Sequence, residues 1–181
     1  MPNGRFAEIV ILAEDRIQVR FIRAWLAEHV SYGQIVNKLS LDGGSGEQFV
    51  RTRFPIEAEL HRRRLAKRGA ILIAVLDADL GEHSAHYRAL LDSVADRAGI
   101  YVFVPKRNIE TWLHQLTGNT ADETTDYKGS YRKDPSEAIR IGAMKFVELV
   151  QSRATEGLIP SLARGIEEAR RIPRLHKMPI R

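Results

Sequence analysis

The sequence predicts an α/β protein with a parallel sheet of about four strands between helices. Two observations predict this fold. Short apolar segments alternate with longer amphipathic ones, as in consecutive strand–helix units. The short segments are apolar throughout rather than at every second position, which is typical of parallel strands buried on both faces. We expect one domain, with a core over residues 1–118 and a polar loop and helices over 119–181 that pack on it.

Four segments have the composition of buried strands, rich in β-branched and other apolar residues. We expect these strands at residues 6–13, 35–41, 70–76 and 100–104. The segment "ILIAVL" at 71–76 gives the clearest strand signal, because it is short and has no polar residue.

Helices are expected between and after these strands, at 16–30, 47–68, 84–98, 109–116, 135–152 and 160–172. Pro55 should break or restart the second helix, because proline lacks the backbone N–H that a helix interior uses. Gly99 should end the third helix in the C-terminal capping position, and Asn108 should cap the start of the fourth.

The composition limits the classes of protein to be considered. The chain has no cysteine, so disulfides and thiolate metal sites are excluded. No apolar run approaches the ~18 residues of a membrane span, and the first residues lack a signal peptide's long apolar core. We therefore expect a cytoplasmic protein with no membrane partner. The net charge of +5 suits a nucleic-acid partner, although simple solubility charge explains it too.

Acidic residues follow three of the four predicted strands. Glu14 and Asp15 end the first, Asp77 and Asp79 end the third, and Glu110 lies in the helix turn after the fourth. In an open parallel sheet the functional groups gather at the carboxyl ends of the strands. Acids also favour helix N-termini and turns for purely structural reasons, an explanation that stays open for each of them.

If the first and third strands are neighbours, Glu14 and Asp77 lie close together and repel each other. A divalent cation removes that repulsion, and a site made of oxygen ligands alone suits Mg²⁺ or Mn²⁺. Asp79 can share the same ion or hold a second one.

These motifs resemble those of Toprim domains, and the resemblance covers roughly residues 6–117. "VILAED" followed by "FIRAWL" is similar to the family's opening strand, glutamate and helix, and "ILIAVLDADL" to its DxD motif. "VFVPKRNIETWL" resembles the segment of OLD-type Toprim nucleases in which a further glutamate opens a helix.

The resemblance implies a Rossmann-like fold and Mg²⁺- or Mn²⁺-dependent phosphodiester chemistry on DNA or RNA. It implies that Glu14, Asp77 and Asp79 are the core metal ligands and that Glu110 is a second-metal ligand. The sequence departs from the family pattern at Asp15, where glycine is usual, and at Gln18, where OLD-type members often have an acid. By analogy, a small stand-alone Toprim protein is the nuclease part of a bacterial defence (phage defence) or toxin-type system, served by a separately encoded ATPase.

Several cationic side chains lie near the predicted site in sequence. Lys106 and Lys128 are candidates to contact phosphate oxygens, and His83 and His86 are minor candidates for metal or phosphate. The segment "RTRFPIEAELHRRRLAKR" forms a basic helix that suits a nucleic-acid backbone or is simply a solvated face. Its basic residues are Arg51, Arg53, Arg62, Arg63, Arg64, Lys67 and Arg68.

Rival interpretations remain. A receiver domain has acids after strand one and an aspartate after strand three, but the order here is Pro105 then Lys106 rather than Lys-Pro. A haloacid-dehalogenase-like phosphatase carries its DxD at the first strand, which here ends in Glu14. A non-catalytic Toprim-like binding subunit is the alternative from a different class. A homo-oligomer is also left open.

Overall fold

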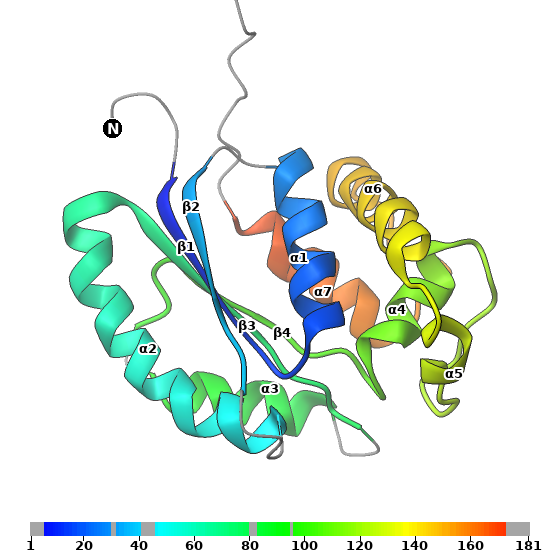
Figure 1. The fold of residues 1–181 in the computed structure, drawn as a ribbon, viewed down its shortest axis with the longest axis horizontal. Coiled ribbons are helices and arrows are strands. Elements are labelled where there is room, and N and C mark those ends of the chain that lie inside the picture. The colour runs from blue at the N-terminus through cyan, green and yellow to red at the C-terminus, as the bar shows by residue number, and fades with distance from the viewer. Residues whose placement is uncertain (1–5, 30–31, 41–45, 80–82, 95, 173–181) are drawn as a thin grey trace, which may run out of the picture.

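The structure is a computed structural model that describes residues 6–29, 32–40, 46–79, 83–94 and 96–172. It is an α/β fold with a four-stranded, all-parallel sheet in the order β2-β1-β3-β4, and helices cover both faces (Figure 1). The predicted fold class is therefore confirmed. The elements are β1 (Phe6–Ala13), α1 (Arg16–His29), β2 (Tyr32–Lys38), α2 (Gly46–Arg68), β3 (Ala70–Val75), α3 (His83–Asp92), β4 (Ile100–Phe103), α4 (Ile109–Leu116), α5 (Lys128–Tyr131), α6 (Ser136–Ser152) and α7 (Pro160–Arg170).

The strands β1 and β3 are the two central strands and pair in parallel, with Ile9 opposite Ile71 and Ala13 opposite Val75. Every residue of β3 and of β4 is buried, as expected for a sheet covered on both faces. Because all four strands run in the same direction, the residues that follow them gather at one edge of the sheet.

Successive side chains of a strand point to opposite faces, so the core has two layers. Ile9 and Ile11 face one layer, which α1, α4 and α6 complete with large aromatic side chains and α7 with aliphatic ones. Val10 and Leu12 face the other, which α2 and α3 cover. Figure 1 shows the same division, with α2 and α3 on one side of the sheet and α1, α6 and α7 on the other.

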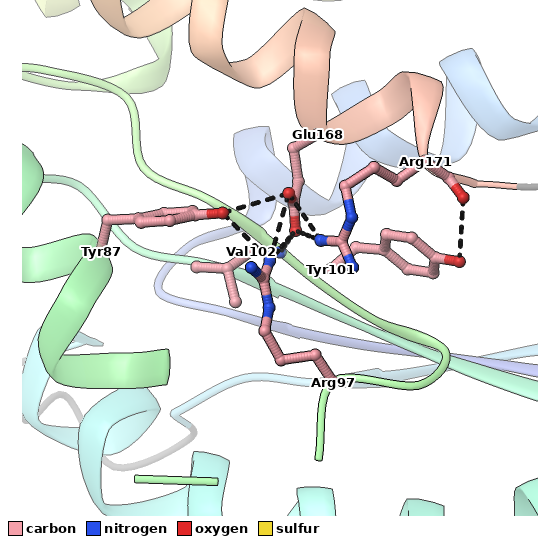
Figure 2. A network of polar contacts seen from close by, with 6 residues as sticks. All are labelled: Tyr87, Arg97, Tyr101, Val102, Glu168 and Arg171. Atoms are coloured by element: carbon pink, nitrogen blue, oxygen red, sulfur yellow. Dashed lines mark hydrogen bonds and ion pairs between the residues drawn. The ribbon is translucent and has the colours of Figure 1, made fainter. Parts of the chain in front are cut away.

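A polar network ties α7 to the edge strand β4 (Figure 2). The buried Glu168 carboxylate accepts a hydrogen bond from the backbone N–H of Val102 at 3.0 Å. Arg97 and Arg171 donate to the same carboxylate at 3.0 and 2.8 Å, and the Tyr87 hydroxyl donates at 3.1 Å. This network occupies a backbone donor that an exposed edge strand offers to another chain.

Two helix predictions are wrong. α2 runs unbroken through Pro55. An interior proline costs about 3 kcal/mol, but Val50, Phe54 and Ala58 on either side of it are buried against the sheet and hold the helix there.

α3 ends at Asp92 rather than at residue 98. Its last turn tightens, because the N–H groups of Ser93 and Val94 bond to carbonyls three residues back. Gly99, at φ 69°, lies in the turn that leads into β4 instead of capping the helix.

The other expected elements are present, β1 and α4 with the predicted bounds and the rest with ends shifted by a few residues at most. β2 begins three residues earlier than its predicted start at 35. Asn108 caps α4 as predicted, because its side chain accepts from the N–H of Thr111. The polar loop contains the short helix α5, and the helices expected at 135–152 and 160–172 are α6 and α7. Within the described part of the chain, no helix combines the length and apolar character needed to cross a membrane.

Candidate functional site

Glu14 and Asp77 follow the two central strands and lie in direct contact. The backbone N–H of Asp77 donates to Glu14 Oε1 at 2.7 Å. The contact follows from the pairing of β1 with β3, which places the residues after Ala13 and Val75 side by side. The Asp77 side chain is only 3% exposed, so the sheet holds it in place.

Gln18, in the first turn of α1, bridges these two residues. Its side-chain N–H donates to Asp77 Oδ1 at 2.9 Å, and its side-chain carbonyl accepts from the N–H of Glu14 at 2.9 Å. The N–H of Gln18 donates to Asp15 Oδ1 at 2.9 Å, so Asp15 acts as a helix-capping acid. Gln18 is fully buried. The sequence pattern marked it only as a departure, and nothing in the spacing signals its bridging role.

The electrostatics of this pair are unfavourable for two charges. Burial raises the pKa of Glu14 to about 7, and the carboxylates of Asp79, Glu47 and Asp15 contribute to the rise. Burial also raises the pKa of Asp77 well above its ordinary value, with Glu14 and Asp15 adding to it and Lys128 partly offsetting it. Without a cation, burial and the neighbouring acids therefore favour the protonated forms of both carboxyls.

Glu110 lies in the first turn of α4, where the Asn108 cap starts the helix. Its side chain is 3% exposed, and Oε2 has no hydrogen-bond partner within the described residues. Burial raises the pKa of Glu110, Asp15 adds to the rise, and Lys128 opposes it. Lys128, on the polar loop, thus lies close enough for its positive charge to lower the pKa of both Asp77 and Glu110.

Asp79 differs from Asp77 in exposure and backbone conformation. Its side chain is exposed and its φ is 46°, a left-handed conformation that is uncommon outside glycine but that aspartate and asparagine adopt more often than most residues. Its carbonyl accepts from the N–H of Arg107 at 3.0 Å, which ties the segment after β3 to the segment after β4. The negative charge of Asp79 contributes to the raised pKa of Glu14.

The N-terminus of α2 packs directly on Glu14. A Cβ on Gly46 would lie 2.8 Å from Glu14 Cβ and 2.9 Å from its carbonyl oxygen, so only glycine permits this approach. The next residue, Glu47, raises the pKa of Glu14. Sequence reasoning missed both residues, although a glycine-rich loop leading into a helix is a recognisable signal for close backbone approach.

Lys106, His86 and Arg51 lie on the α2 and α3 side of the site. Arg51 contacts His86 at 2.6 Å, and Lys106 lies close enough to affect the pKa of His86. The side chain of His83 is outside the described residues.

The basic residues of α2 are largely paired with acids. Arg51 pairs with Glu47, Arg53 with the buried Glu57, and Arg64 with Glu8. Arg62 and Arg63 both pair with Glu59. The side chains of Lys67 and Arg68 are outside the described residues. The helix therefore offers less uncompensated charge than its sequence indicates.

The side chains of this site are of the kind that binds a divalent cation. The donors are carboxylate oxygens, which Mg²⁺ and Mn²⁺ prefer. Burial raises the pKa of Glu14, Asp77 and Glu110, and a bound cation would favour their charged forms. Glu110 Oε2 is a buried acceptor that meets no hydrogen-bond donor in the described part of the chain. Among the described side chains, however, no three acids or histidines already converge on one ion position. Binding therefore requires side-chain rearrangement, for which the exposed Asp79 and the half-buried Glu47 are available.

Comparisons with models of protein families, with curated proteins and with solved structures found no match to this chain.

Proposed function

We propose that this protein is a divalent-metal-dependent phosphodiesterase of the Toprim type that cleaves nucleic acid. One observation carries the proposal: Glu14 and Asp77 lie in contact at the carboxyl ends of two central parallel strands, both with raised pKa values. Strongly perturbed carboxylates held rigidly at a sheet edge are more typical of a functional site than of a structural one.

Glu14, Asp77 and Asp79 would hold Mg²⁺ or Mn²⁺, and Glu110 would complete a second position. A bound cation supplies a water of lowered pKa and neutralises charge on the phosphate. Gln18 keeps Asp77 Oδ1 in a hydrogen bond, which fixes the orientation of that carboxylate. Alternatively, Glu110, with its raised pKa, would accept a proton from the attacking water instead of holding an ion. Lys128 and Lys106 would bring positive charge to the phosphate.

The biological setting follows from the resemblance alone. A stand-alone Toprim nuclease suits a bacterial defence or toxin-type system with a separately encoded ATPase.

The proposal is tested by incubating the full chain with end-labelled DNA and RNA in Mg²⁺ or Mn²⁺. Wild type should cleave at least one of them, and Asp77→Asn should lose about 100-fold or more of the rate. Asparagine keeps the Oδ1 acceptor for Gln18, so the fold is preserved. The matched control is Asp92→Asn, an exposed acid at the end of α3, which should cleave as wild type does. Equal rates in wild type and Asp77→Asn would remove the catalytic assignment.

A non-catalytic binding subunit is the second candidate. It is favoured by the absence, in the described residues, of three acids or histidines that already share one position. Nucleic-acid binding with no metal-dependent cleavage in the same assay supports this candidate instead.

A further inference from the structure

Arg51 and His86 form a close contact between α2 and α3 beside the carboxylate site. The Arg51 guanidinium lies 2.6 Å from His86 Nδ1, and its Nε donates to Glu47 Oε1 at 2.8 Å. The two side chains are 33% and 19% exposed, so both are held in place yet reachable from solvent.

The contact fixes the protonation of His86. A guanidinium has only N–H donors, so Nδ1 must be the acceptor and the ring proton must lie on Nε2. Burial lowers the pKa of His86, and the charge of Arg51 lowers it further, so the ring stays neutral at pH 7. His86 therefore offers one N–H donor at Nε2.

The pair lies next to the proposed metal ligands. The N–H of Arg107, the residue after Lys106, donates to the carbonyl of Asp79 at 3.0 Å, so the two segments lie side by side at the carboxyl end of the sheet. The charges of Lys106 and Asp79 both affect the pKa of His86. Three donors thus come from three elements: Arg51 from α2, His86 from α3 and Lys106 from the segment after β4. The positive charges of Arg51 and Lys106 would repel a cation bound by the carboxylates, but they would attract an anion beside that cation.

We propose that Arg51, His86 and Lys106 form a subsite that binds a non-bridging phosphate oxygen of a phosphodiester, beside Asp79. The substrate class rests on the proposed function. Glu47 orients the guanidinium, Arg51 fixes the tautomer of His86, and Lys106 contributes charge. In this arrangement the negative phosphate lies between the subsite and the carboxylates.

Side-chain ¹H–¹⁵N spectra of the histidines test this subsite in the full chain without metal, at about pH 8. His86 should show the Nε2–H tautomer. Inorganic phosphate, and separately a mixed-sequence single-stranded oligodeoxynucleotide, should shift its Nε2 resonance, whereas sodium chloride of equal ionic strength should not. The resonances of His114, in α4, serve as the internal control.

Arg51→Gln should reduce the phosphate affinity about tenfold, and Arg140→Gln, an exposed arginine of α6, should leave it unchanged. An Nδ1–H tautomer, or equal shifts with phosphate and chloride, would overturn the subsite. A response to inorganic phosphate alone would exclude a phosphodiester. The titration involves neither metal nor cleavage, and Glu14→Gln should keep the phosphate response. Failure here is therefore distinguishable from failure of the catalytic proposal.

Discussion

The backbone N–H of Asp77 donates to Glu14 Oε1 across 2.7 Å, so the two central strands end in one hydrogen-bonded acidic pair. The backbone donor stabilises the Glu14 carboxylate but does not offset its burial, and the pKa stays raised, at about 7. Burial thus disfavours the charged form of Glu14 in the folded protein. Removing this carboxylate should therefore change the free energy of unfolding.

Glu14→Gln should stabilise the protein at alkaline pH. The pKa of Glu14 moves from 4.5 to about 7 on folding, so the folded state keeps a proton that the unfolded chain releases. Stability from this group is complete below pH 4.5 and is lost as the pH rises to about 7. After a discount for solvent screening, the gain in unfolding free energy at pH 8 should be about 1–2 kcal/mol.

Urea denaturation of wild type and Glu14→Gln measures this gain, which should be smaller at pH 5 than at pH 8. The control is Glu156→Gln, an exposed glutamate before α7, which should change little at either pH. A gain in Glu14→Gln that is larger at pH 5 would contradict the assigned pKa shift.

Gln18→Glu should destabilise the protein increasingly as the pH rises. The new carboxylate would lie at hydrogen-bond distance from Asp77 Oδ1, now 2.9 Å from the Gln18 amide. Two carboxylates at that distance share a proton, and the proton is lost at alkaline pH. We expect a loss of about 2–3 kcal/mol at pH 8 and a smaller loss at pH 5. Thermal denaturation checks this, with the exposed Gln151→Glu as control; a pH-independent loss would argue against the bridge.

Gly46→Ala should disturb Glu14 through the backbone. Its Cβ would meet Glu14 Cβ at 2.8 Å and the Glu14 carbonyl oxygen at 2.9 Å, and neither can move freely. The expected cost is about 1–3 kcal/mol of unfolding free energy, together with weaker metal binding. Gly129→Ala is the matched control, because nothing lies within 4 Å of a Cβ there. Wild-type stability in Gly46→Ala would show that α2 does not pack on Glu14 in this way.

Glu168→Ala should weaken the attachment of α7 to β4. It leaves Arg97 and Arg171 without their shared carboxylate and the Val102 N–H without an acceptor. We expect a loss of about 2–4 kcal/mol, because a buried acceptor serves several donors. Denaturant midpoints compare it with Glu167→Ala, the exposed neighbour on the same helix. Equal midpoints for the two variants would mean that the network contributes nothing.

The sequence predicts the sheet, because the apolar composition of each strand is a local pattern. It also predicts the contact of Glu14 with Asp77, because parallel pairing places the residues that follow neighbouring strands side by side. The uninterrupted α2 was not predictable from Pro55, since the packing of Phe54 and Ala58 that holds it is tertiary. The bridging role of Gln18 and the contact of Arg51 with His86 depend on side chains far apart in sequence, 59 and 35 residues in these two bonds. The pattern of residue types along the chain does not indicate which distant side chains come into contact.

The central claim is that Glu14 and Asp77 hold a divalent cation. Calorimetric titration of MnCl₂ into the full chain at about pH 8, where both carboxylates are more fully ionised, tests it most directly. We predict saturable binding to wild type and to the control Asp92→Asn, and at least about tenfold weaker binding to Asp77→Asn and Glu14→Gln. Binding of equal affinity in all four proteins, or no binding to wild type, would contradict the claim.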